Sequence, residues 1–315
     1  MKNILVLGMG KVGSMVGVLL SRNFEVTALD QKKPHYDYNL PFECIEGDVT
    51  DIGFMKNLMK DYDAVVSALP YFLNKEIAIL AHELELHYFD LTEDVPTTHF
   101  IQALSETSKK VMAPQCGLAP GLIGIVGKDL TSNFDTLRDI ELRVGALPRY
   151  PNGQLAYSFT WSPHGVINEY LNDAEAIHNG QRKNVPSLEG FEYINIEGQE
   201  FEAFTTSGGL GTLCETFDGK VDTLNYKTIR YPGHGKLMKF LMYELILKDD
   251  KDFQNYLTTF MGTDFSAYQV RKSMGKDFTK TVYEKLGTNT FKKMIEIPPN
   301  TKELKDPQLY LKKLS

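Results

Sequence analysis

The chain has 315 residues, and at roughly 150 residues per domain this length predicts about two domains. Hydrophobic residues make up 42% and charged residues 24%, the proportions of a folded protein, which excludes a disordered or low-complexity chain. Acidic residues number 41 against 34 basic ones, so the net charge is -7, which excludes a phosphate-tracking basic surface and predicts no nucleic-acid partner.

The cysteines and the apolar segments indicate the compartment. Cys44, Cys116 and Cys214 are too far apart for a metal-ligand motif and suggest no disulfide framework, so we expect no metal site and a reducing, cytoplasmic setting. Glycines and Lys11 interrupt the apolar N-terminal run, and no A-x-A site follows it, so we expect no secretory leader. No segment has the roughly 18 to 20 apolar residues of a membrane span, so we expect no membrane partner.

Short apolar runs alternate with helix-period segments over the first 113 residues. We expect strands over residues 3–8, 25–30, 42–47, 64–68, 88–91 and 111–113. We expect helices over residues 12–20, 54–59, 74–85 and 97–109. In the first helix we expect one buried stripe of Val12, Met15, Val16, Leu19 and Leu20. This alternation favours an α/β, Rossmann-type doubly wound parallel sheet, which we assign to residues 1–120.

From residue 121 the pattern changes, and we assign residues 121–315 to an α+β substrate-binding and dimerisation domain. Strand-like runs cover residues 137–144 and 200–206. Two turn-rich segments, 161–165 and 206–211, are expected to be loops that carry chemistry. From about Gly235 the spacing of apolar residues predicts helices, and we expect the C-terminal helices to pack back on the first domain. These apolar residues are Leu237, Phe240, Leu241, Leu245 and Ile246.

A glycine-rich turn joins the first expected strand to the first expected helix. It reads G-x-G-x-x-G, in the order Gly8, Met9, Gly10, Lys11, Val12, Gly13. In such a turn the first glycine permits the tight bend, the second lets the backbone approach a pyrophosphate, and the third allows close helix packing. The helix N-terminus then receives the anion. The segment therefore predicts a dinucleotide-binding site.

Asp30, at the end of the second expected strand, is placed to accept a hydrogen bond from the adenosine ribose. A carboxylate there would repel a 2′-phosphate, so the cofactor is expected to be NAD rather than NADP. Lys32 and Lys33 could pair with a phosphate, and they leave NADP open. Further expected cofactor contacts are Asp48 and Val49 beside the adenine, and Ala68, Leu69 and Pro70 along the phosphates and ribose.

Four ordered motifs resemble a known family. They are residues 116–121, residues 161–162 with 165–170, residues 206–209 and residues 226–234. Together they resemble the saccharopine dehydrogenase superfamily, and within it they are most similar to lysine 6-dehydrogenase. The resemblance covers residues 1–245, whereas residues 250–315 depart from the family pattern. It implies hydride transfer from the ε-amine carbon of L-lysine to NAD, with an amino acid as substrate and a homo-oligomeric enzyme.

That chemistry needs a neutral amine, although an ε-ammonium has a reference pKa of about 10.4, so a base is expected nearby. Arg230 is the best candidate to hold the substrate carboxylate, because its guanidinium binds carboxylates in a bidentate manner. Candidate catalytic residues are Asp90, His164 and Glu169. The other expected substrate contacts are Tyr71, Glu93, Trp161, Tyr170, Thr206, Ser207, Gly208 and Tyr231. Cys116 is expected to pack beside the cofactor.

Two other functions remain open. One is reductive coupling of an aldehyde to an amine with NADPH, as in saccharopine reductase or carboxynorspermidine dehydrogenase. The other is a non-catalytic regulator that senses the dinucleotide. The first predicts activity only in the reductive direction with two organic substrates, and the second predicts NAD binding without any reduced cofactor formed from an amine.

Overall fold

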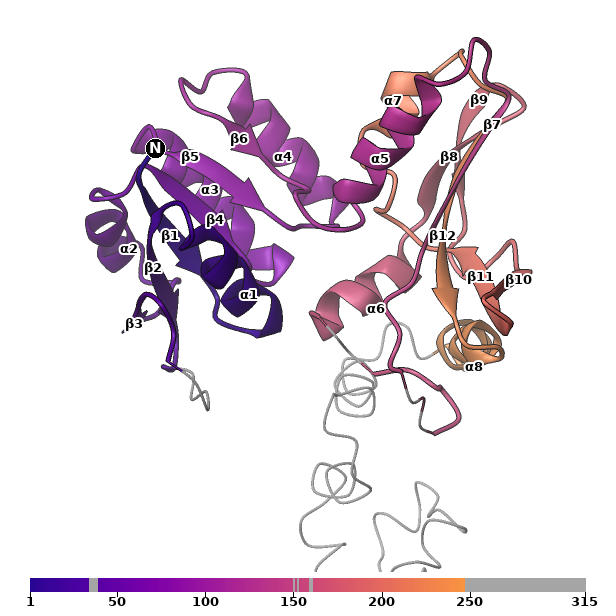
Figure 1. The fold of residues 1–315 in the computed structure, drawn as a ribbon, viewed down its shortest axis with the longest axis horizontal. Helices are drawn as coiled ribbons and strands as arrows, with labels where there is room; N and C mark the ends of the chain where they lie inside the picture. The colour runs from indigo at the N-terminus through magenta and orange to yellow at the C-terminus, as the bar shows by residue number, and fades with distance from the viewer. Residues whose placement is uncertain (34–38, 150, 152, 159–160, 247–315) are drawn as a thin grey trace, which may run out of the picture.

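The computed structural model describes residues 1–33, 39–149, 151, 153–158 and 161–246. These residues form two sheet-containing domains, with the N-terminal domain in indigo to magenta and the second domain in magenta to orange (Figure 1). The expected C-terminal helices beyond residue 246 lie outside the described residues. No described helix is both long enough and apolar enough to cross a bilayer.

The first domain is built on a six-stranded parallel sheet, which confirms the predicted fold class. Its strand order is β3-β2-β1-β4-β5-β6, and every pair of neighbours is parallel. The strands are β1 (Asn3–Leu7), β2 (Glu25–Asp30), β3 (Glu43–Glu46), β4 (Ala64–Ser67), β5 (His87–Asp90) and β6 (Met112–Ala113). Each lies within about two residues of its predicted range. The carboxyl ends of these strands therefore meet at one edge, where open α/β sheets bind their ligands.

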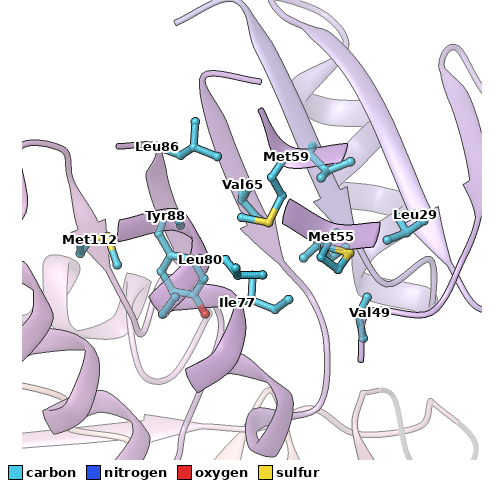
Figure 2. Packing of buried hydrophobic residues seen from close by; sticks show 14 of the residues in the cluster. Leu29, Val49, Met55, Met59, Val65, Ile77, Leu80, Leu86, Tyr88 and Met112 are labelled. Atoms are coloured by element: carbon cyan, nitrogen blue, oxygen red, sulfur yellow. The ribbon is translucent and has the colours of Figure 1, made fainter. Parts of the chain in front are cut away.

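Helices follow most of these strands. They are α1 (Lys11–Leu20), α2 (Ile52–Met59), α3 (Asn74–Glu83) and α4 (Val95–Ser105), with a short 3-10 turn, η1 (Tyr71–Leu73), before α3. Asp51 and Asp94 cap α2 and α4, because their carboxylates accept hydrogen bonds from Phe54 N at 3.0 Å and Thr97 N at 2.9 Å. Side chains from α2, α3 and α4 pack against one face of the sheet in the cluster drawn in Figure 2.

The predicted buried stripe of α1 is confirmed only in part, because Val16 and Leu20 are partly buried against the core whereas Val12, Met15 and Leu19 are exposed. Met15 is 65% exposed and Leu19 48% exposed, and the buried positions are Gly13, Ser14 and Gly17. A Cβ at Gly17 would lie 2.7 Å from the ring of Phe42, so only a residue without a side chain allows this close packing. Helix α1 therefore approaches the sheet through its small residues, which turns much of the apolar stripe towards solvent.

The second domain contains a mostly antiparallel sheet. Its order is β10-β11-β12-β8-β9, and β7 pairs in parallel with β12. The strands are β7 (Asp139–Val144), β8 (Ala174–His178), β9 (Gln181–Val185), β10 (Glu192–Ile196), β11 (Gln199–Thr205) and β12 (Thr223–Arg230). The helices are α5 (Leu122–Thr131), α6 (Pro163–Leu171), α7 (Leu213–Phe217) and α8 (His234–Lys239), followed by a π-helical turn, η2 (Phe240–Glu244). Helix α6 extends towards the first domain (Figure 1).

One further expectation about this domain is corrected, and another is confirmed. His164 was expected in a loop, but it lies in the first turn of α6, because Ser162 caps that helix and Pro163 begins it. The helical segment predicted after Gly235 is present as α8 and η2, although most of the apolar residues whose spacing predicted it are exposed, including Leu245 at 49%. The buried side of this segment carries His234, Met238 and Met242.

Candidate functional site

The glycine-rich turn has the geometry of a dinucleotide-binding loop. Gly8 has a φ of +87°, and its N–H donates to Leu29 O at 2.8 Å. A Cβ at Gly13 would overlap the carbonyl oxygen of Gly8, whereas a Cβ at Gly10 would meet nothing within 4 Å. Gly8 and Gly13 thus permit the turn, and Gly10 leaves open space in front of it.

That open space belongs to a cavity of about 430 Å³ that both domains line. The first turn of α1 has no side-chain cap, so its amide groups are free to bind an anion in the cavity. The bare backbone and the helix N-terminus therefore fit the diphosphate of a dinucleotide. The lining residues are Gly10, Lys11, Val12, Gly13, Asp30, Ala68, Pro70, Trp161, Ser162, Pro163 and His164.

Asp30 lies beside the glycine turn. Its Oδ2 accepts a hydrogen bond from Met9 N at 2.6 Å, and its Oδ1 accepts one from Lys32 N at 3.2 Å. The carboxylate therefore braces the loop and lines the cavity at the same time. A 2′-phosphate brought to this edge would meet a fixed negative charge.

The other residues expected at the cofactor are placed in different ways. Asp48 Oδ1 accepts from Thr50 N at 2.9 Å in an exposed turn, and Val49 is buried in the core under α2. Leu69 packs against the same core. Cys116 is exposed, rather than packed as expected, and lines a separate apolar cavity of about 270 Å³ on the sheet face beside α1. None of these four is among the residues that line the cavity at the glycine turn.

The second domain closes this cavity with the segment that leads into α6. Trp161 and His164 were expected at the site, whereas Ser162 and Pro163, which also line the cavity, were not assigned a role from the sequence. Their Ser-Pro pair is a helix-start signal and would have placed them at the N-terminus of α6. The His164 ring packs edge-on against Phe72 with centroids 5.8 Å apart. Phe72 in turn packs edge-on against Tyr71 at 5.7 Å.

Asp90 is fully buried at the carboxyl end of β5. Its carboxylate accepts from Tyr88 OH at 2.8 Å, from Thr92 N at 3.0 Å and from Gln115 N at 3.2 Å. Burial raises the pKa of this carboxyl, and the three hydrogen bonds oppose that rise. Asp90 therefore holds together the two loops that follow β5 and β6.

Glu93 lies between the two domains. A Cβ at Gly165 would lie 2.7 Å from its Oε1, and a Cβ at Gly208 would overlap its backbone oxygen. These two glycines let the second domain pack directly on Glu93. The residue is 6% exposed, and among the described residues its Oε1 has no hydrogen-bond partner. Burial, followed by the charges of Asp94 and Asp90, raises the pKa of Glu93 to about 7.

Glu169 lies on α6 and is 4% exposed. Burial, together with the neighbouring charge of Glu93, raises the pKa of Glu169 well above the usual carboxyl range, although Arg230 opposes the rise. Burial thus favours the protonated form of Glu169. The backbone oxygen of Glu169 accepts from Ser207 N at 3.0 Å and from Ser187 Oγ at 2.9 Å.

Arg230, at the end of β12, is buried against aromatic rings. Its guanidinium carbon lies 4.3 Å from the ring centroid of Tyr157, and its Nε donates to Tyr170 OH at 2.9 Å. Its Nη1 donates to Ile229 O at 2.9 Å. Neither of these two hydrogen bonds uses Nη2.

The hydrogen bonds around Tyr170 continue to His234. Nδ1 of His234 lies 2.7 Å from Leu155 O, which only accepts, so Nδ1 carries the proton. Nε2 then accepts from Tyr170 OH at 3.0 Å. Burial and the charge of Arg230 lower the pKa of His234 to about 3, so the imidazole is neutral. Sequence analysis assigned no role to Tyr157 or His234, although His234 ends the motif at residues 226–234.

The remaining expected substrate residues surround this core. Thr206 Oγ1 lies 2.7 Å from Thr228 Oγ1, so its hydroxyl is already hydrogen-bonded within the protein. Tyr231 points away from Arg230 and donates its hydroxyl proton to Pro148 O at 2.9 Å. Ser207 and Gly208 line a second cavity of about 470 Å³ between α4 and the second domain. Glu93 lines it as well, together with Thr98 and Asn168, which were not singled out from the sequence.

Two family models cover most of the chain. One, described as the saccharopine dehydrogenase NADP binding domain, matches residues 4–115. The other, described as the saccharopine dehydrogenase C-terminal domain, matches residues 117–298. Their order along the chain is that of the two domains of the structure.

Similar proteins include two curated enzymes. Mitochondrial alpha-aminoadipic semialdehyde synthase of Mus musculus is 25% identical over 263 residues, covering 75% of this chain and 27% of that protein. Saccharopine dehydrogenase (NADP(+), L-glutamate-forming) of Saccharomyces cerevisiae is 23% identical over 281 residues, covering 79% of this chain and 59% of that protein. The chain thus spans about a quarter of the length of the first and three-fifths of the second.

The same fold occurs in a solved structure. Apo histidine-tagged saccharopine dehydrogenase (L-Glu forming) from Saccharomyces cerevisiae matches with a TM-score of 0.59 and 23% identity, covering 79% of this chain and 60% of that one. At this level of identity the likeness establishes the fold.

Proposed function

The chain belongs to the saccharopine dehydrogenase family, and on that premise we propose that it is a nicotinamide-dinucleotide-dependent oxidoreductase acting on the C–N bond of an amino acid. We take the substrate to be L-lysine, oxidised at the ε-amine carbon, and the cofactor to be NAD. Both domains contribute to this proposal, because the first carries the dinucleotide site and the second carries Arg230 and α6.

One observation carries the proposal, namely the shared cavity at the glycine turn. Gly10 and Asp30 line it from the first domain, and Trp161 and His164 line it from the second. A dinucleotide held on the first domain would therefore meet residues of the second domain. Such a junction of two domains is a common place for a small-molecule site.

When bound, the cofactor would supply a nicotinamide ring that accepts a hydride. The protein would hold its diphosphate on the glycine turn and its adenosine ribose at Asp30. The substrate carboxylate would bind Arg230, and its ε-ammonium would lie among the carboxyl groups that follow β5. Positioning of the two reactants accounts for most of what the chain's own residues supply.

Purified protein is to be incubated with NAD or NADP and with L-lysine, saccharopine or a polyamine while absorbance of the reduced cofactor is followed. NADH formed from lysine alone is the expected result. Dinucleotide binding without reduction by any amine would favour a regulator, and absence of binding to either dinucleotide would overturn the oxidoreductase proposal.

A second candidate function rests on the similarity to the yeast protein, whose name gives NADP and L-glutamate. Reduced cofactor formed only from saccharopine would support this candidate. The charge of Asp30 at the ribose edge weighs against it, because it disfavours a 2′-phosphate.

Asp30→Ala is expected to raise the KM for NAD about tenfold with little change in kcat, because a ribose contact stabilises ground and transition states alike. The KM for NADP is expected to fall, since the repulsion is removed. Steady-state kinetics with both cofactors measure the two changes. Asp61→Ala, at an exposed aspartate of the same domain, is the control and should change neither. An unaltered NAD/NADP preference in Asp30→Ala would remove Asp30 from the ribose site.

Arg230→Lys is expected to weaken substrate binding by roughly 1 to 3 kcal/mol, the range for a hydrogen bond to a charged group. Lysine cannot reproduce the planar fork that contacts Tyr170 through Nε and would present Nη2 to a carboxylate. The substrate KM is the measurement, with Arg138→Lys as control because Arg138 is exposed. Unchanged substrate KM in Arg230→Lys would show that Arg230 does not bind the substrate.

A further inference from the structure

We propose that Glu93 is the proton acceptor that converts the substrate ammonium to the amine, and that it releases the proton into the second cavity. This inference rests on the proposed function. The sequence identified Glu93 only as a residue that holds the ammonium, and left the proton acceptor open among Asp90, His164 and Glu169.

The position of Glu93 is the first argument. It follows β5 at the carboxyl edge of the sheet, where substrates of open α/β folds bind. A Cβ at Gly165 would touch both its Oε1 and the ring of Trp161, and Trp161 lines the cofactor cavity. Glu93 also lines the second cavity. Its carboxyl group thus lies at the partition between the two cavities.

Its hydrogen bonding is the second argument. Oε1 of Glu93 is buried and has no hydrogen-bond partner among the described residues. Buried polar atoms are nearly always hydrogen-bonded, so an acceptor without a donor calls for a donor from outside the protein. A substrate ammonium supplies three N–H donors. Thr98 Oγ1 likewise has no partner among these residues, and Thr98 also lines the second cavity.

The charges around Glu93 make it a suitable acceptor. Asp94 and Asp90 lie on its own segment, Tyr71 faces it from η1 and Glu169 from α6. Arg230, at the end of β12, carries a positive charge that lowers the pKa of Glu169. Burial and the neighbouring carboxylates raise the pKa of Glu93 to about 7, so it both accepts and releases a proton near neutral pH.

The other candidates are less suited. The carboxylate of Asp90 already accepts three hydrogen bonds. Burial and the charge of Glu93 raise the pKa of Glu169 well above the usual carboxyl range, which favours its protonated form and makes it a poorer proton acceptor. His164 packs edge-on against Phe72, itself 55% exposed.

The proposed step moves one proton from the substrate to Glu93. An N–H bond of the ε-ammonium breaks and an O–H bond forms on the Glu93 carboxylate, leaving a neutral amine and a neutral acid. With a dinucleotide bound, the nicotinamide would accept a hydride from the amine carbon, and water would hydrolyse the resulting iminium to aldehyde and ammonium. The Glu93 proton leaves to solvent and restores the carboxylate, so each turnover consumes one water and releases one proton.

Glu93→Gln in the full chain tests the proposal. The expected kcat at pH 7 falls at least about 100-fold, the usual range for loss of a general base. In wild type, kcat is expected to rise with pH to a plateau above about pH 7. In Glu93→Gln the rise of kcat to a plateau near pH 7 disappears. Instead, kcat increases about tenfold per pH unit towards pH 10, because only the free amine of lysine reacts. Glu93→Asp, which keeps the carboxylate, should retain the rise of kcat to a plateau, with a lower kcat at the plateau.

Glu106→Gln is the matched control, because Glu106 is an exposed glutamate of the same domain that is not among the residues lining either cavity. Its kcat and pH profile should match wild type. A Glu93→Gln enzyme with wild-type kcat and an unchanged profile would overturn the assignment while leaving the proposed function intact.

A second readout does not need turnover. Infrared difference spectra of wild type against Glu93→Gln should show a protonated-carboxyl band that disappears with a midpoint near pH 7. A midpoint below pH 5 would overturn the proposal. If wild type reduces neither cofactor with any amine, the proposed function fails, and this titration still decides whether Glu93 exchanges a proton near neutral pH.

Discussion

Gly13→Ala is expected to abolish dinucleotide binding and to lower the free energy of unfolding by about 3 kcal/mol, at the upper end of the usual cost of overpacking. The added Cβ would overlap the backbone oxygen of Gly8 and lie 3.1 Å from the Cβ of Ala68, and Gly8 itself lies in a tight turn at φ +87°. The turn and the N-terminus of α1 would separate, and the anion site would be lost with them. Urea unfolding and calorimetric titration with NAD measure the two effects.

Gly10→Ala is the matched control. A Cβ at Gly10 meets nothing within 4 Å, so the protein should fold with a free energy of unfolding within about 0.5 kcal/mol of wild type. The methyl group would project into the open space of the cavity, so NAD affinity should fall although stability does not. Wild-type stability and affinity in Gly13→Ala would contradict the described packing of the turn.

Glu93→Gln is also expected to change how stability depends on pH. The pKa of Glu93 is raised from 4.5 to about 7, mainly by burial, so the native state binds this proton more tightly than the unfolded state. Wild type therefore loses stability as pH rises from about 4.5 to about 7, by about 3 kcal/mol at 1.36 kcal/mol per pH unit. Glutamine carries no charge and escapes this loss.

The measurement is the difference in unfolding free energy between Glu93→Gln and wild type at pH 4.5 and pH 8. The variant should gain about 3 kcal/mol relative to wild type between these values. Glu93→Gln also removes the charge that raises the pKa of Glu169, so the measured gain belongs to the coupled pair. Glu106→Gln should show no such gain, since Glu106 is exposed. If the difference in unfolding free energy between Glu93→Gln and wild type did not depend on pH, the pKa of Glu93 would not be raised by folding.

The site was predictable where its signal is local. Asp30 and the glycine turn were found because a strand, a turn and a helix that adjoin in the sequence also adjoin in space, and each of the six predicted parallel strands was marked by its own run of apolar residues. His164 was misplaced although the signal for the helix start, Ser162 followed by Pro163, was present in the sequence.

The division of roles among the acidic residues was not predictable in this way. Asp90, Glu93 and Glu169 are all carboxylic acids near predicted strand or helix ends, and they differ in what the fold places around them. Asp90 receives three donors, Glu93 is enclosed by Gly165 and Gly208, and Glu169 is buried beside Glu93. Those neighbours are far away in the sequence, so periodicity and motif spacing carry no information about them.

By itself, the sequence determined the parallel sheet, the order of the elements in the first domain and the dinucleotide turn, because these depend on hydrogen bonds and side-chain spacing within short segments. Only the tertiary structure decided which face of α1 is buried, which residues line the cavity between the domains, and which carboxyl group is free to exchange a proton. These properties depend on burial and on charges brought together from distant segments, and desolvation acts on a group only once the fold has enclosed it.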